Sequence, residues 1–379
     1  MKLSFSKEDL IRAIQAVQSS ISTKSTLPIL SNLLIRSEKT AKGLGIRIEA
    51  TDLEVGIRCG VKGEALEVGK ITVPAKRFGD LVREMPNDHP IELNTSDGRR
   101  VELQCGKVKA TILSLPPEDF PLIPEFPEEK SFKLKKSLFQ DMIRKTHFAI
   151  SFDETRYVLN GIYFLAQQGE IKMVATDGRR LAYVWKNGFE KNLNATVIIP
   201  SKAVSELMRL LSAGDFKEDW IQIAPYENQI SFKWMDFGEE IHLLSRVIDG
   251  KFPNYEQVIP KTKEIEISVE TTRLLSAVKR AALFAQDHSG SVRFALSDGF
   301  LKISANAQNV GEEEEELEVP YKGAHFEIAF NPHFLLDVLK NSEGPKVNLE
   351  FTNSLNPGMI KPAGVENYLC VIMPMRLQN

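Results

Sequence analysis

Apolar and polar residues alternate on both sides of a short polar segment in IKMVATDGRRLAYVW, which runs from Ile171 to Trp185. Such alternation is typical of a β-strand with one buried face, and Asp177-Gly178 is a dipeptide that favours a tight hairpin turn. A related segment, IRIEATDLEVGIRC, begins at Ile46 and has the same Ala-Thr-Asp core. We therefore expect one hairpin to be built twice, which suggests a duplicated domain.

A helical pattern of apolar positions occurs three times, in ITVPAKRFGDLVREM, VIIPSKAVSELMRLL and IAFNPHFLLDVLKNS. In the first of these, Phe78, Leu81, Val82 and Met85 fall at i, i+3, i+4 and i+7, the spacing of one helix face. Three other segments pass from a short strand pattern into a helical one: MKLSFSKEDLIRAIQAV, KSFKLKKSLFQDMIRKT and EIEISVETTRLLSAVKRAALF. Together they predict helices at 7–17, 75–85, 135–147, 201–211, 270–284 and 331–341.

Two proline-rich connectors separate the repeats. LSLPPEDFPLIPEF and RVIDGKFPNYEQVIP share a Phe-Pro pair, at Phe120-Pro121 and Phe252-Pro253. Proline-rich segments are poor interiors for helices and strands and good domain boundaries. We place three domains at 1–126, 127–256 and 257–379, each an α+β unit of two helices packed on antiparallel sheet.

Composition is that of a globular protein without a membrane segment. The chain has 379 residues, of which 42% are hydrophobic and 26% charged, and no charge-free apolar run is long enough to span a bilayer. The N-terminus carries charges where a signal peptide would be apolar, so we expect a cytoplasmic protein. Cys59, Cys105 and Cys370 are far apart and odd in number, which favours three reduced thiols.

Lysine and arginine are concentrated in the predicted helices, although the net charge is -3. The six helical windows contain 15 Lys and Arg against 8 Asp and Glu, whereas the rest of the chain contains 33 against 43. At about 100° per residue, many of these side chains point away from the apolar face. The outward positions predicted by comparing the repeats are Lys76, Arg83, Lys202, Arg209, His333 and Lys340 in one helix family and Gln15, Ala16, Arg144, Lys145, Lys279 and Arg280 in the other.

Two interpretations of these cations remain open at this point. They can be solvated residues chosen for helix propensity, or they can form one basic surface that contacts DNA phosphates without reading bases. The acidic run from Glu312 to Glu316 is interpreted as a solvated strand entry or loop.

Motifs that would indicate catalysis or metal binding are missing. The histidines form no HExxH pattern, and no G-x-S-x-G segment is present. Gly63 to Lys70 superficially resembles a P-loop, but it has one residue too many between the glycines and Ile71 where Ser or Thr would hold magnesium. We expect no catalytic residues, no metal and no cofactor, while an enzyme with a site dispersed along the sequence remains an alternative.

The chain resembles the family of the bacterial DNA polymerase III beta subunit, the sliding clamp, over its whole length. The segments that carry the resemblance are TLPILSNLL, TRYVLNGIYF, MVATDGRRLA, GKFPNYEQVIP and VIMPMRL, which begin at residues 26, 155, 173, 250 and 371. The resemblance implies a non-enzymatic processivity factor: a head-to-tail ring dimer of three-domain chains, with twelve helices around a central hole. It also implies non-sequence-specific binding of duplex DNA, and a groove for short apolar peptide motifs of the replicative polymerase, clamp loader and repair proteins.

The resemblance also assigns residues to these surfaces. The DNA-binding residues it implies are Lys24, Lys76, Arg83, Arg144, Tyr157, Lys202 and Lys279. The groove it implies comprises Leu159, Thr176, Gly178, Arg179, Arg180, Leu181, Pro253, Val258, Leu355, Val371, Ile372, Met373, Pro374, Met375, Arg376 and Leu377, with the arginines at its rim. Ordinary core packing would explain the apolar members of the groove equally well.

Three positions depart from the family pattern. Val158 stands where relatives can carry a second aromatic residue, Gln257 stands where they can carry arginine, and Ala110 replaces a bulky residue at the first-domain edge. For the dimer interface we therefore expect Ala110 on one edge and Leu283 with Phe284 on the other. An alternative from another class is a multidomain enzyme or metabolite-binding protein built from the same unit, which would need clustered polar residues in one cleft.

Overall fold

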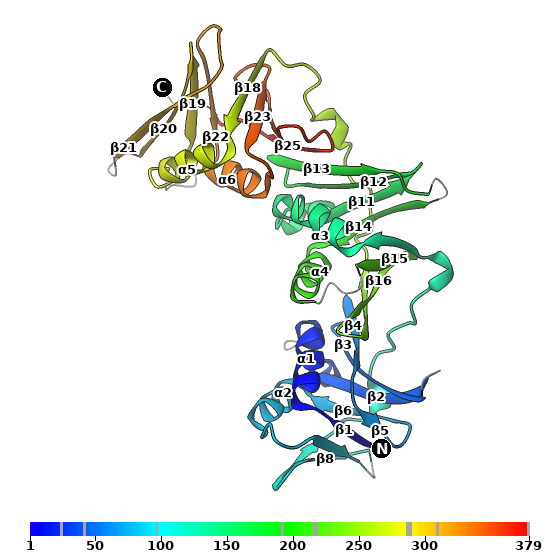
Figure 1. Ribbon diagram of the computed structural model, residues 1–379. Helices are drawn as coiled ribbons and strands as arrows, with labels where there is room; N and C mark the ends of the chain where they lie inside the picture. Colours follow the sequence, from blue (N-terminus) through cyan, green and yellow to red (C-terminus); the bar gives the residue numbers. More distant parts are fainter. Residues whose placement is uncertain are drawn as a thin grey trace. The chain divides into compact units, whose positions relative to one another are not determined.

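The antiparallel strands and amphipathic helices expected from the sequence are present in the computed structural model (Figure 1). The structure describes residues 1–22, 26–40, 43–95, 98–190, 193–214, 219–226, 228–285, 290–307 and 311–376. The chain forms two compact units: Met1–Gln140 with Lys202–Val247, and Asp141–Ser201 with Ile248–Asn379.

All six predicted helices are confirmed, with small shifts at their ends. They are α1 (Lys7–Val17), α2 (Ala75–Glu84), α3 (Lys136–Arg144), α4 (Ser201–Ala213), α5 (Thr271–Ala282) and α6 (Pro332–Asn341). The helix predicted to reach residue 147 ends at Arg144. Thr146 follows, and its hydroxyl donates to the carbonyls of Met142 and Ile143 at 2.9 and 3.2 Å, which closes the helix end before a 3-10 turn at His147–Ala149.

The first unit contains two antiparallel sheets. The smaller sheet has the order β5-β1-β7-β8-β9 and the larger has the order β10-β15-β16-β17-β4-β3-β2-β6. The strands are β1 (Lys2–Phe5), β2 (Asn32–Thr40), β3 (Gly43–Thr51), β4 (Val55–Val61), β5 (Glu64–Ala65), β6 (Gly69–Pro74), β7 (Ile91–Asn94), β8 (Arg100–Cys105), β9 (Val108–Leu113), β10 (Phe132–Lys135), β15 (Trp220–Tyr226), β16 (Gln229–Asp236) and β17 (Glu239–Arg246).

The second unit repeats this plan. Its sheets have the orders β14-β11-β12-β13-β25-β24-β23-β18 and β21-β20-β19-β22. The strands are β11 (Gly161–Gln167), β12 (Glu170–Thr176), β13 (Arg180–Asn187), β14 (Asn194–Pro200), β18 (Ile265–Glu270), β19 (Val292–Ser297), β20 (Phe300–Ala307), β21 (Gly311–Glu318), β22 (Phe326–Phe330), β23 (Lys346–Phe351), β24 (Gly358–Pro362) and β25 (Tyr368–Ile372).

Two pairs of helices pack side by side. In the first unit α1 lies beside α2, and a Cβ added to Gly79 of α2 would lie 3.5 Å from the Ile14 side chain of α1. In the second unit α5 packs beside α6. The apolar faces of these helices are buried through residues such as Phe78 and Leu335, which leaves the opposite faces for other contacts.

Each large sheet combines strands from two sequence repeats. Leu243 of β17 pairs with Ile57 of β4 in the first unit, and Cys370 of β25 pairs with Ala182 of β13 in the second. The two hairpins predicted from the Ala-Thr-Asp segments are β3–β4 and β12–β13, and each lies beside the strand that joins the two repeats. Both hairpins are therefore held against a strand of another repeat.

Candidate functional site

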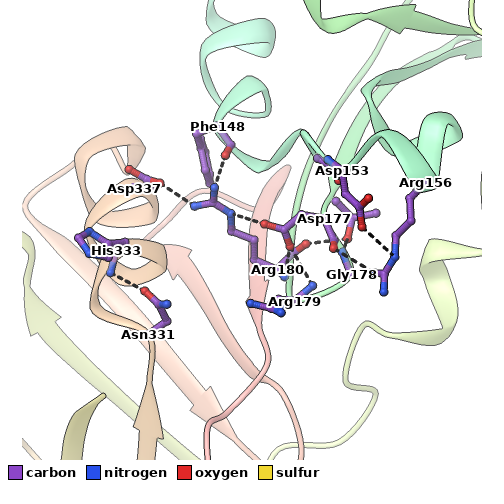
Figure 2. A network of polar contacts seen from close by, with 12 residues as sticks. Phe148, Asp153, Arg156, Asp177, Gly178, Arg179, Arg180, Asn331, His333 and Asp337 are labelled. Carbon is purple, nitrogen blue, oxygen red and sulfur yellow. Dashed lines mark hydrogen bonds and ion pairs between the residues drawn. The ribbon is translucent and has the colours of Figure 1, made fainter. Parts of the chain in front are cut away.

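The turn at Thr176–Arg180 is held by its own side chains. The Thr176 hydroxyl donates to the Arg180 carbonyl at 2.6 Å and accepts from the Gly178 N–H at 3.1 Å. One carboxylate oxygen of Asp177 accepts from the backbone N–H groups of Arg179 and Arg180 at 2.8 and 3.0 Å (Figure 2). Gly178 has φ +84°, a left-handed conformation that glycine adopts without strain. The predicted turn role of Asp177-Gly178 is confirmed.

The first repeat builds the same turn with the same hydrogen bonds. The Thr51 hydroxyl donates to the Val55 carbonyl at 3.1 Å and accepts from Leu53 N–H, and Asp52 accepts from the N–H groups of Glu54 and Val55. Leu53 stands at the position of the glycine and has φ +78°, which is strained for a bulky residue. The backbone conformation of the turn is therefore common to both repeats. The two copies differ in the residues that occupy the turn.

Arg180 does not lie free at a groove rim as expected. Its guanidinium forms ion pairs with Asp177 at 3.1 Å and with Asp337 of α6 at 2.6 Å. It also donates to the Phe148 carbonyl at 2.5 Å and stacks 4.6 Å from the Phe334 ring centroid. Only 11% of the side chain is exposed, so Arg180 fastens the turn to α6, as Figure 2 shows. Arg179, next to it, is exposed.

An apolar cluster lies beside this turn. Leu159, Leu181 and Val371, three of the predicted groove residues, are buried in it. The sequence interpretation missed further members of the cluster: Val174, Ile198, Phe252, Tyr255, Met359 and Leu369. The repeated Phe-Pro pair could have indicated one of them, Phe252. This residue stacks on Tyr163, with the ring centroids 4.8 Å apart. Burial raises the pKa of Tyr183, which packs against the cluster, to about 12, so its phenol is neutral at physiological pH.

Exposed apolar side chains accompany the buried cluster. Val258, Leu355 and Met373 are exposed, and Leu355 is 80% accessible. Pro253 and Gly178 are also exposed, whereas Thr176, Pro374 and Met375 are half-buried. Of the predicted groove residues, these exposed and half-buried positions can be reached by a partner, whereas Leu159, Leu181 and Val371 are buried.

The C-terminal segment runs alongside the turn. The Met373 N–H donates to the Arg179 carbonyl at 2.8 Å, and the Met375 N–H donates to the Ala329 carbonyl at 2.7 Å. Ile372 is fully buried, so its side chain belongs to the core and not to an accessible groove. Arg376 is exposed, and Leu377 lies outside the described residues.

The predicted DNA-binding cations differ in their surroundings. Lys76 and Lys279 are exposed, as is Tyr157. Arg83 pairs with Asp80, Lys202 with Asp52, and Arg144 with both Asp141 and Glu343. Lys24 lies outside the residues that the structure describes.

Two of the outward positions predicted from helix geometry, Lys145 and Ala16, are wrong. Lys145 is buried, with its ammonium 2.6 Å from Asp141 and 5.7 Å above the ring of Tyr368. Ala16 is buried as well. Arg209 is half-buried and donates to the carbonyls of Gln15 and Ala16 at 3.0 and 2.8 Å, so it joins α4 to the end of α1.

Two strands lie at the ends of their sheets. β9, which contains Ala110, ends the five-stranded sheet, and β21 ends the four-stranded sheet. Leu283, just after α5, is 62% exposed, and half-buried Phe284 lies beside Gly311 at the start of β21. The acidic run predicted to be a strand entry or loop forms β21 itself. Because edge strands have unpaired backbone groups, both can accept another strand.

No side-chain cluster suited to a metal ion occurs in the part of the chain that the structure describes. Cys59, Cys105 and Cys370 are buried free cysteines, and burial raises the pKa of the Cys59 and Cys370 thiols to about 12. These two are therefore thiols and not reactive thiolates. None of the helices formed by the described residues is long and apolar enough to cross a membrane.

Repetition of this α+β unit, with cations on its helices and one turn specialised beside an apolar cluster, defines a clamp-type protein. Family models for the DNA polymerase III beta subunit match the chain in order: the N-terminal domain at residues 1–124, the central domain at 133–254 and the C-terminal domain at 256–376. The beta sliding clamp of Chlamydia muridarum is 35% identical over 380 residues, and that of Escherichia coli is 33% identical over 378 residues; both matches cover 100% of each chain.

Solved structures agree with these matches. The DNA polymerase III subunit beta of Pseudomonas aeruginosa has 32% identity and a TM-score of 0.90, and the DNA polymerase sliding clamp of Bacillus subtilis has 26% identity and a TM-score of 0.92, each over 100% of both chains. The chain belongs to the family of DNA polymerase III beta subunits, the beta sliding clamps, and its function is that of a DNA sliding clamp. The alternative of a multidomain enzyme or metabolite-binding protein is not favoured.

Proposed function

We propose that two copies of the chain close head to tail into a ring around duplex DNA. Each copy contributes three domains, at 1–126, 127–256 and 257–379, and no catalysis is involved. The ring tethers the replicative polymerase, the clamp loader and repair proteins to DNA in the cytoplasm. The observation that carries this proposal is that Lys76 and Lys202, at equivalent positions of two repeated helices, are both exposed. Repeated helices with equivalent cations suit a surface that follows phosphates without reading bases.

Opposite charges on the two edge strands support head-to-tail closure. Lys109 of β9 and Lys107 just before it are exposed. β21 contains Glu312, Glu314 and Glu316, which are also exposed. Unlike edges of this kind favour pairing between the two ends of different copies and disfavour pairing of like ends. Ala110 would lie in the first edge, with Leu283 and Phe284 beside the second.

DNA contacts in this proposal come from the helices and the segments near them. Lys24, Lys76, Arg83, Arg144, Tyr157, Lys202 and Lys279 are the proposed contacts. Tyr157 is an exposed aromatic residue in the 3-10 helix Glu154–Leu159, close to the start of β11. Phosphate contacts of this type weaken as salt rises, which lets a topologically held ring move along the duplex.

The apolar surface beside the Thr176–Arg180 turn is proposed to bind short peptides of partner proteins. Exposed Met373 and Leu355 can adapt to leucine or phenylalanine anchors, since methionine is flexible and polarizable. Exposed Arg179 and Arg376 supply positive charge at the rim, whereas Arg180 holds the scaffold in place. A related structure supports ligand binding by this family: the sliding clamp of Pseudomonas aeruginosa has been solved bound to griselimycin.

Sedimentation equilibrium tests the ring proposal at the level of assembly. A ring made of three-domain chains requires two of them, so we expect twice the 42.6-kDa chain mass at micromolar concentration. A chain that remains monomeric at high concentration would contradict the proposal.

A further inference from the structure

Three of the proposed DNA-binding cations are already paired with carboxylates inside their own unit. Arg83 pairs with Asp80 within α2, Lys202 of α4 pairs with Asp52, and Arg144 of α3 pairs with Glu343 beyond α6. Lys76 differs: it is exposed, and among the described residues no carboxylate lies within ion-pair distance of it. Lys76 and Lys202 occupy equivalent positions in two repeats, so they form a natural comparison.

Asp52 is held rigidly where it meets Lys202. One carboxylate oxygen accepts from the backbone N–H groups of Glu54 and Val55 at 3.0 and 2.8 Å, which fixes the side chain in the hairpin turn. The other oxygen pairs with the Lys202 ammonium. The Asp52 side chain is only 10% exposed, whereas Lys202 is 46% exposed, so a largely buried carboxylate faces a more exposed cation. Little entropy is lost on the carboxylate side when this pair forms.

In the second unit, Glu343 is a more exposed carboxylate that contacts two cations. It pairs with Arg144 and lies 3.4 Å from Lys145, while Asp141 contacts the same two cations at 2.6 Å each. Two carboxylates therefore face two cations, and the cluster has no net charge. A phosphate that approaches Arg144 must compete with Glu343.

We propose that Asp52, Asp80 and Glu343 are resident counterions that weaken the contacts between DNA and the cations they hold. The inference rests on the proposed DNA-binding function of these cations. A cation paired with a carboxylate neutralises a phosphate less completely than a free one, and its release from the carboxylate opposes binding. The carboxylates thus lower affinity for the duplex while the ring maintains the association, which favours rapid movement along DNA.

The test is a double-mutant cycle on duplex binding, with Lys202 and Asp52 as the pair. Anisotropy measures the affinity of the full-length protein for a labelled duplex across a salt series. The duplex has about 30 base pairs, which is longer than one DNA-binding face of the protein. Asp52→Asn keeps an oxygen that can accept from the turn N–H groups, so the hairpin is preserved. Asp298→Asn, at an exposed turn between β19 and β20, is the control for the same change of net charge.

We expect Asp52→Asn to raise affinity by about two- to fivefold and to steepen the slope of log K against log salt by up to about 0.9. Lys202→Ala should weaken binding less than Lys76→Ala in the wild-type background. In the Asp52→Asn background, Lys202→Ala should weaken binding as much as Lys76→Ala does. Glu343→Gln, at a residue remote in sequence from the Asp52 turn, should raise affinity independently through Arg144.

Equal effects of Asp52→Asn and Asp298→Asn, or no coupling between Asp52 and Lys202, would overturn the inference while leaving the clamp proposal in place. The proposed function fails separately if the wild-type protein is not retained on closed circular DNA. In that case the counterion proposal fails as well, because it assumes that these cations contact DNA inside a closed ring.

Discussion

Arg180 and Arg179 are adjacent in the chain, yet their side chains have different roles. Arg180 bridges Asp177 and Asp337 and is largely buried, whereas Arg179 is exposed. From sequence both looked like rim residues, because the partner of Arg180 lies on a helix more than 150 positions away. A pattern along one strand cannot show which of two arginines meets an acid from a distant element.

Replacement of Arg180 is therefore expected to affect stability. Arg180→Ala leaves Asp337 and the Phe148 carbonyl without this partner, so we expect the free energy of unfolding to fall by about 3 kcal/mol. Arg179→Ala, the matched control at the exposed neighbour, should change it by less than about 0.5 kcal/mol. Urea denaturation of both variants measures the difference, and equal losses would contradict the bridging role.

His242 is a buried histidine whose protonation should affect stability. Burial, followed by the charges of Arg58 and Lys233, lowers the pKa of His242 to about 3, and no partner for either ring nitrogen is present among the described residues. Its ring lies edge-on to Phe126 with centroids 5.7 Å apart. The imidazole therefore stays neutral in the folded protein at pH values where it would be protonated after unfolding.

The sign of the effect on stability follows from these protonation states. Above its ordinary pKa of about 6.5 the residue adds no pH dependence, and below that value the unfolded chain binds the extra proton. Stability should therefore fall by about 1.4 kcal/mol per pH unit as pH drops from 6 towards 4. His242→Leu should reduce this slope in urea denaturation measured from pH 6 to 4. An unchanged slope would show that His242 is not the group responsible.

At the scale of elements, the sequence patterns predicted the hairpins and helices well. Apolar alternation with Asp177-Gly178 located β12 and β13, and helical spacing located α2 around Phe78. The patterns did not predict that Lys145 turns inward, because it follows the last residue of α3 and meets Tyr368 of a strand far along the chain. The burial of Ile372 was missed for a similar reason, since β25 lies inside an eight-stranded sheet.

The candidate groove was predicted by family resemblance more than by pattern. Its exposed members, such as Met373 and Leu355, have no periodicity that distinguishes a binding surface from a loop. Its buried support, including Phe252 and Met359, comes from separate segments that only the fold brings together. The sequence pattern alone therefore does not predict which residues form this surface.

The candidate groove leads to a prediction about peptide binding. Met373→Ala with Leu355→Ala removes two exposed apolar side chains, so partner peptides with leucine and phenylalanine anchors should bind about tenfold or more weakly. Leu181→Ala is avoided, because Leu181 is buried and its truncation would also destabilise the fold by about 2–5 kcal/mol. Val68→Ala, at an exposed apolar residue of the first unit, is the matched control. Isothermal titration that gives equal affinity for all three proteins would reject the groove.

At the scale of the whole molecule, repetition was visible in the sequence but the sharing of sheets was not. The pairing of β17 with β4, and of β25 with β13, joins strands from different repeats into eight-stranded sheets. The boundaries proposed at the proline-rich connectors divide the sequence, whereas the two compact units divide the central repeat. Sequence periodicity identifies repeats, but long-range strand pairing decides which strands form one sheet.

The proposed closure of the ring leads to a prediction about assembly. Leu283→Ala with Phe284→Ala removes apolar surface beside the edge strand β21, so the dimer should dissociate into monomers in sedimentation velocity. Phe300→Ala, at an exposed residue of β20, is the control for loss of an aromatic side chain in the same sheet and should leave the dimer intact. A persistent dimer in the double variant would place the interface elsewhere.

Retention on circular DNA distinguishes a closed ring from a protein that binds DNA only by contact. The protein is loaded onto nicked circular duplex by a clamp loader, freed of unbound protein by gel filtration at about 0.2 M salt, and then divided so that one half is cut with a restriction enzyme. A ring held by topology stays on the intact circle and slides off the linear molecule, because its phosphate contacts are weak. Equal retention on both forms, or none on either, would contradict the account.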